Sequence, residues 1–129
     1  MNITLLPPVP QTPLLYRATA LNVNQANTDI GTFTGLPTLY IVRRLTFNNA
    51  SATPTLATVA LRTAAAGAGT AIVTAQALST LSAASTFVDS TLAVTTATQN
   101  SATLVLRAVA AAGVAATVDA TLEIEVLVP

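Results

Sequence analysis

The segment from Thr117 to Val128 alternates between apolar and polar residues, and this pattern limits the possible folds more than any other feature of the chain. Successive side chains of a β-strand point to opposite faces, so the alternation predicts a half-buried antiparallel strand. One face would carry Val118, Ala120, Leu122, Ile124 and Val126, and the other Asp119, Thr121, Glu123 and Glu125. We expect Val118, Leu122, Ile124 and Val126 to line the core together with Leu104 and Leu106.

The rest of the chain consists mostly of short runs of Thr, Val, Leu, Ile and Ala separated by turn residues. β-Branched residues favour strands, whereas clusters of Gly, Pro, Asn and Asp mark turns. The runs predict six further strands at Leu14–Leu21, Thr38–Phe47, Leu56–Thr63, Thr70–Ala75, Phe87–Thr95 and Thr103–Ala110. Residues 22–37 are interpreted as a long polar loop, and residues 75–88 as a loop with one short helix as the alternative.

Two hairpins are expected among these strands. Residues 103–110 would pair with residues 117–128 through a turn at Ala111–Gly113. Residues 56–63 would pair with residues 70–75 through a turn rich in Gly and Ala. Antiparallel strands joined by short turns are the simplest neighbours in a sheet.

Seven or eight short strands with regular turns predict an all-β protein with a single antiparallel β-sandwich, resembling a jelly roll. The sequence leaves an immunoglobulin-like topology open as the alternative. We assign residues 14–129 to this domain, since 129 residues suit one domain with a substantial core.

Residues 1–13 contain Pro7, Pro8, Pro10 and Pro13. Proline fixes φ and removes a backbone donor, so neither a helix nor an interior strand fits this segment. It is predicted to be an extended N-terminal arm, about 40 Å long as polyproline II. The arm is either a disordered tail or a segment that lies on a neighbouring subunit or on a capsid surface. In the second case its apolar anchors are Leu5, Leu6 and Val9.

The composition excludes several kinds of chemistry. The chain has no His, Cys, Lys or Trp, and five arginines balance five acids, for a net charge of zero. Without His and Cys, the usual ligands of zinc, haem and iron–sulfur clusters are missing, and Ser-His or Cys-His triads cannot form. We therefore expect no cofactor, no metal site and no enzymatic activity. Nucleic acid is not an expected partner either, because phosphate binding needs a surplus of basic residues.

Two acidic residues, Glu123 and Glu125, would lie about 7 Å apart on one strand face. That separation is found in inverting glycosidases, but a solvated strand face is the preferred interpretation. The chain has only five aromatic residues, which disfavours both a glycosidase cleft and a carbohydrate-stacking surface.

Arg43 and Arg44 are consecutive in a predicted strand, so their side chains should point to opposite faces. One of them would then lie on the inner side, near a strand end or at a subunit contact. Buried arginine is normally paired. We consider an intersubunit salt bridge to an acid such as Glu123 or Asp89.

The outer faces of the predicted sheets hold mainly Thr, Ser, Ala, Val and Asn, although soluble monomers usually carry many charges there. This pattern indicates a surface covered by copies of the chain or by a partner, and we expect a homo-oligomer, with a trimer favoured over a dimer. A membrane is not an expected partner. The hydropathy comes mainly from alanine, and no long window is dominated by Leu, Ile, Val or Phe.

The proline-rich start Leu5-Leu6-Pro7-Pro8-Val9-Pro10, the run Tyr16–Ala20 and the run Tyr40–Phe47 together resemble the head decoration, or cement, proteins of tailed bacteriophages. The resemblance concerns the general character of the whole chain and includes no diagnostic motif. No binding residue can therefore be carried over.

The resemblance implies a structural virion protein that binds the outer capsid lattice and stabilises it, with the major capsid protein as its partner. Such a protein is made in the host cytoplasm and ends on the capsid exterior. The alternative function is a receptor- or carbohydrate-binding β-sandwich of a virion fibre or an adhesin.

Overall fold

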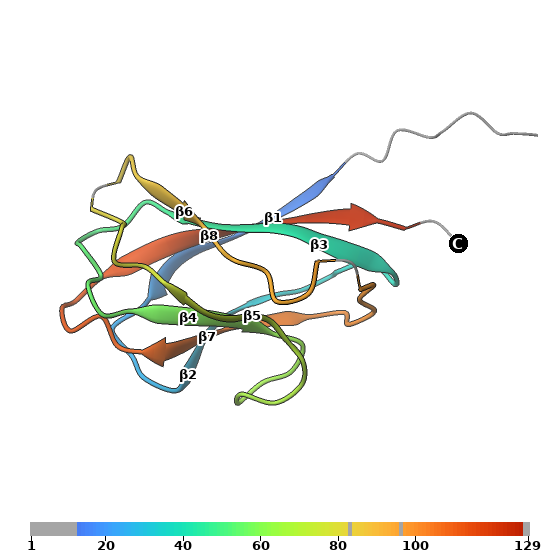
Figure 1. Cartoon of the computed structure of the whole chain (residues 1–129), viewed down its shortest axis with the longest axis horizontal. Coiled ribbons are helices and arrows are strands. Elements are labelled where there is room, and N and C mark those ends of the chain that lie inside the picture. The colour runs from blue at the N-terminus through green and yellow to red at the C-terminus, as the bar shows by residue number, and fades with distance from the viewer. Residues whose placement is uncertain (1–12, 83, 96, 128–129) are drawn as a thin grey trace, which may run out of the picture.

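The computed structural model describes residues 13–82, 84–95 and 97–127, which form two four-stranded antiparallel sheets packed as a sandwich (Figure 1). The predicted all-β sandwich is confirmed, and the described residues contain no helix. The strands are β1 (Leu14–Asn22), β2 (Thr28–Phe33), β3 (Tyr40–Asn48), β4 (Thr58–Arg62), β5 (Ala71–Ala77), β6 (Phe87–Asp89), β7 (Leu104–Ala110) and β8 (Thr117–Val126).

The strand order identifies the sandwich as a jelly roll. One sheet has the order β1-β8-β3-β6 and the other the order β2-β7-β4-β5. Except for β4 and β5, consecutive strands alternate between the two sheets, and the first strand pairs with the last. This is the arrangement of two nested Greek keys, and it removes the immunoglobulin-like alternative.

One of the two predicted hairpins is confirmed and the other is wrong. β4 pairs with β5 as expected, whereas β7 and β8 belong to different sheets. The connection 111–116 crosses the end of the sandwich: Ala112 N donates to Val23 O at 3.0 Å, and Val23 N donates to Ala116 O at 3.1 Å. Because a neighbouring loop satisfies its backbone groups, the connection need not form a tight turn.

The predicted polar loop 22–37 contains strand β2, which pairs with β7. Gly and Asp are common in turns, but Asp29 and Gly31 lie within strand β2. A Cβ on Gly31 would lie 2.6 Å from Leu21 Cδ2, so glycine permits the close approach of β2 to the end of β1. The register shift between Asp29 and Gly31 lies at the same place.

The predicted strand Phe87–Thr95 is shorter in the structure, where β6 ends at Asp89. Beyond it the chain leaves the first sheet and reaches the second, since Ala93 N donates to Ile72 O at 2.8 Å. The described residues between β5 and β6 form a loop, as preferred. Its leucines, Leu78 and Leu81, are fully buried in the core.

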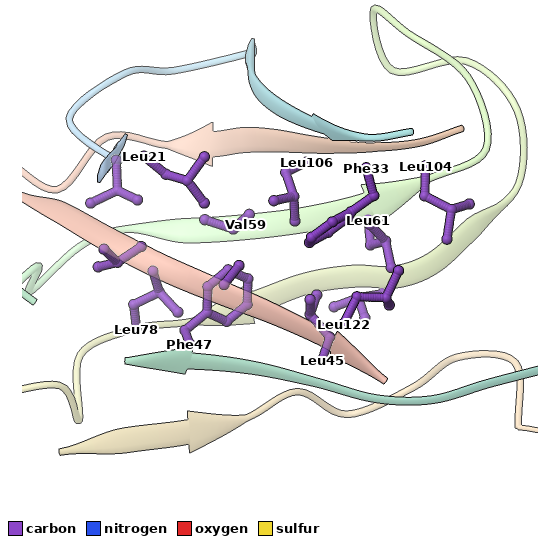
Figure 2. Packing of buried hydrophobic residues seen from close by; sticks show 14 of the residues in the cluster. Leu21, Phe33, Leu45, Phe47, Val59, Leu61, Leu78, Leu104, Leu106 and Leu122 are labelled. Carbon is purple, nitrogen blue, oxygen red and sulfur yellow. The ribbon is translucent and has the colours of Figure 1, made fainter. Parts of the chain in front are cut away.

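The apolar core fills the space between the sheets (Figure 2). Val118, Leu122 and Ile124 of β8 and Leu104 and Leu106 of β7 are fully buried, as the alternation predicts. Val126 is only half-buried, because it lies at the end of β8.

Candidate functional site

The charged residues of this protein all lie in strands, and none lies in a loop. Seven of the ten belong to the β1-β8-β3-β6 sheet, namely Arg17, Arg43, Arg44, Asp89, Asp119, Glu123 and Glu125. The other sheet holds Asp29, Arg62 and Arg107. The expectation that the outer faces of the sheets hold mainly uncharged residues is thus not met on the first sheet, although the loops are uncharged.

Arg43 and Arg44 both lie exposed on that outer face, which corrects the expectation that they point to opposite sides. The register of β3 against β8 shifts between Val42 and Arg44, so an extra residue stands in β3 at this point. Such a bulge breaks the alternation and lets two consecutive side chains share a face.

The two arginines bind acids of the neighbouring strand in the same chain. Arg43 Nε donates to Glu125 Oε2 at 2.6 Å, and Arg44 Nε lies 3.8 Å from Glu123 Oε2. These pairs form because β3 and β8 are adjacent and place the residues side by side. A bridge from Arg43 or Arg44 to an acid of another subunit stays a prediction, and it would have to compete with these internal contacts.

Asp119 is the one charged residue with a buried side chain among the described residues, although the alternation places it on the solvent face. Its carboxylate accepts from Arg17 Nη2 at 2.7 Å, from Ala20 N at 2.9 Å and from Asn49 Nδ2 at 3.0 Å. Ala20 has a positive φ of 53°, which is uncommon for a residue with a Cβ, and the bond from its backbone amide to Asp119 helps to hold this conformation. The Arg17 guanidinium, followed by the Ala20 amide, keeps the pKa of Asp119 below its ordinary value.

A second group of contacts fixes the β4–β5 loop to the outside of the other sheet. Asp29 accepts from Ala66 N at 2.9 Å and from Arg107 Nη1 at 2.9 Å, and these bonds lower the pKa of Asp29 in that order of importance. Arg62 donates to the carbonyls of Ala68 and Gly69 in the same loop. Thus the charges of this sheet also bind groups within the chain.

The shifted pKa values predict how stability depends on pH. Asp29 and Asp119 have folded pKa values below 3.8, so their contribution is complete above that pH and is lost as the pH falls through the folded pKa. Burial, with the charge of Tyr16 as a smaller cause, raises the pKa of Tyr40 to about 12, so its contribution is complete below pH 10.0 and is lost as the pH rises toward 12. Since no His, Cys or Lys is present, we expect a constant melting temperature from about pH 5 to 9.

Circular dichroism melts across this pH range check the prediction. Tyr40→Phe should remove much of the alkaline loss, because the phenolic proton is then gone. A stability transition near neutral pH would contradict the assignment.

A hollow on the surface runs along β5. It has a volume of about 400 Å³ and is lined by Thr74, Ala75, Gln76, Ala77, Thr91 and Ala93. Its lining contains no aromatic or charged side chain, so it offers neither a stacking platform nor a general acid or base.

Large exposed apolar side chains occur at several places on the described surface. They are Leu14, Leu15, Leu56, Phe87, Val109 and Val114. Leu15 and Phe87 are each 66% exposed and belong to the opposite edge strands of the first sheet. The predicted arm anchors Leu5, Leu6 and Val9 lie outside the described residues.

No group of three or more potential metal-ligating side chains occurs within residues 13–82, 84–95 and 97–127. The same described residues include no helix long and apolar enough to cross a membrane. Compared with known proteins, the chain matches no family model, no curated protein and no solved structure.

Proposed function

We propose that this chain is a structural virion protein that binds the outer lattice of a capsid and stabilises it as a decoration protein. The observation that carries the proposal is the neutral surface. All ten charged side chains bind partners within the chain, and every loop is uncharged. A surface of this kind favours broad, uncharged contacts with a protein partner over binding to charged ligands.

The fold and the apolar side chains agree with that role. Jelly rolls are frequent among viral capsid and lectin domains, and the analogy of fold by itself does not fix the function. Leu56 is 65% exposed and Val114 is 47% exposed, in two loops that contain no charge. Such side chains stabilise an assembly when a partner covers them.

In this proposal the major capsid protein is the partner, and the chain acts as a homo-oligomer, with a trimer favoured. It is made in the host cytoplasm and resides on the capsid exterior. The N-terminal residues 1–13 contribute to binding through Leu5, Leu6 and Val9.

Truncation at Leu14 tests the proposal. The full chain should co-sediment with expanded, undecorated capsids of the virus that encodes it, and the truncated protein should bind more weakly while keeping its circular dichroism spectrum. A full chain that leaves such capsids unbound, or a glycan array that gives specific binding instead, would point to the receptor-binding alternative.

Capsid binding should depend little on salt. The screening length falls from roughly 14 Å to 4 Å between about 0.05 M and 0.5 M salt, which weakens interactions between exposed charges. Because the charges of this chain are paired internally, we expect the dissociation constant to change by less than about threefold over that range. A steep salt dependence in a sedimentation titration would show that charged residues carry the binding.

A further inference from the structure

The two central strands of the β1-β8-β3-β6 sheet carry opposite charges on their outer face. β8 contributes Glu123 and Glu125, whereas β3 contributes Arg43 and Arg44. In the register of the two strands, Glu123 and Arg44 lie directly opposite each other. A line drawn between β8 and β3 therefore separates an acidic strand from a basic one.

The edge strands of the same sheet also carry opposite charges, with the signs exchanged. A row of aligned residues runs across the sheet from Arg17 of β1 through two threonines to Asp89 of β6. At about 4.8 Å between neighbouring strands, Arg17 and Asp89 each lie roughly 7 Å from the central line. Both rows thus place opposite charges at equal distances on the two sides of this line.

We propose that this outer face binds the same face of a second copy, with a twofold axis parallel to the strands. Such an axis turns the sheet over and exchanges its two sides, so β8 of one copy faces β3 of the other. Arg44 then lies opposite Glu123 of the second copy, Arg17 lies opposite Asp89 of the second copy, and each contact occurs twice. An axis perpendicular to the strands would instead bring the acids of β8 against each other, which is unfavourable.

The arginines can make these contacts without losing their partners in the same chain. The side chains of Arg17 and Arg44 are 58% and 60% exposed, so they extend toward a facing copy. Arg44 Nε lies 3.8 Å from Glu123 Oε2, which is longer than a hydrogen bond. A guanidinium has five N–H donors, so the bond from Arg17 Nη2 to Asp119 leaves others for the second copy.

Apolar side chains at the two edges of this face would be covered as well. Leu15 is aligned with Glu123 and Phe87 with Asn48, so both lie on the outer face. Each is 66% exposed, which exceeds the other large apolar side chains of the described residues. The face measures about 19 Å across its strands and about 25 Å along them. That area is at the low end for specific interfaces, so we expect a dimer that dissociates in the micromolar range.

A twofold contact of this kind closes on itself and gives a dimer. It therefore favours the dimer, which the sequence left as the alternative to a trimer. The contact uses the face of a sheet and neither the uncharged loops nor residues 1–13. The inference thus does not depend on the proposed capsid role, and a failure of capsid binding would leave it unaffected.

Two charge reversals test the inference. Arg44→Glu places acid opposite Glu123 of an identical copy, and Glu123→Arg places arginine opposite Arg44 in the same way. Sedimentation equilibrium at several concentrations should show a dimer for the intact chain and a dissociation constant at least about tenfold higher for each variant alone. An equimolar mixture should restore a one-to-one dimer, because an acidic face then meets a basic one. The pair within each chain stays broken in both variants, so only contacts between copies can explain this rescue.

Arg17→Glu and Asp89→Arg form a second pair of variants with the same expected result, and circular dichroism identifies the variants that fold. Ala115→Glu and Ala115→Arg are the matched controls, because Ala115 is exposed but lies in the loop between β7 and β8. Both controls should dimerise like the intact chain. A monomeric or trimeric intact chain, reversals that dimerise as the intact chain does, or mixtures of folded variants that form no dimer would each overturn the inference.

Discussion

Replacing Leu122 with alanine is expected to destabilise the protein by about 2–5 kcal/mol, the usual range for a buried leucine. Leu122 is fully buried in the core, and it lies opposite Tyr16 of β1 and Leu45 of β3. The substitution would leave a cavity, and the strands on both sides would keep the surrounding residues from closing it. At about 4 °C per kcal/mol for a domain of this size, the melting temperature should fall by about 8–20 °C.

Thr121→Ala is the control, because Thr121 is the preceding residue of the same strand and faces outward. Thr121→Ala should lower the free energy of unfolding by less than about 1 kcal/mol. Thermal or denaturant unfolding at one protein concentration compares the two variants, since oligomerisation would otherwise shift the melting temperature. Similar losses for Leu122→Ala and Thr121→Ala would mean that β8 does not separate a core face from a solvent face.

Replacing Asp119 with alanine is expected to lower the free energy of unfolding by about 2–4 kcal/mol. The change leaves the Ala20 amide and the Asn49 side-chain amide without their acceptor, and each orphaned, partly buried donor costs about 1–3 kcal/mol. The salt bridge to Arg17 adds little, because the Arg17 side chain is 58% exposed.

Asp89→Ala provides the comparison, since Asp89 is exposed and accepts from the Thr46 hydroxyl. It should change the free energy of unfolding by less than about 0.5 kcal/mol. Arg17→Ala should also cost much less than Asp119→Ala. Equal effects of Asp119→Ala and Arg17→Ala in denaturant melts would show that the ion pair matters more than the amide contacts.

The sequence determined the elements whose signal is local. The alternation in 117–128 requires one buried face, and β8 shows that face with Leu122 and Ile124 in the core. The β4–β5 hairpin follows equally from two short strands and a turn rich in Gly and Ala. An all-β sandwich could therefore be predicted from periodicity alone, since periodicity reports which side chains avoid water.

Strand partners were decided only by the tertiary structure. β8 pairs with β1 and β3 and not with β7, although β7 is its neighbour in sequence. β2 could not be recognised in 22–37 because its glycine serves the packing against Leu21 and not a turn. Pairing between distant strands depends on how whole faces fit together, which no local pattern encodes.

The same distinction applies to the charged residues. The sequence determined that ten charges balance to zero, but not that each would find a partner within the chain. A single bulge in β3 places Arg43 and Arg44 on one face beside Glu125 and Glu123. The register between β1 and β8 brings Asp119 to the Ala20 amide. The periodicity of the sequence indicates which face of a strand a residue lies on. Its neighbours on that face depend on the bulges and the strand register, and both are established only when the sheets assemble.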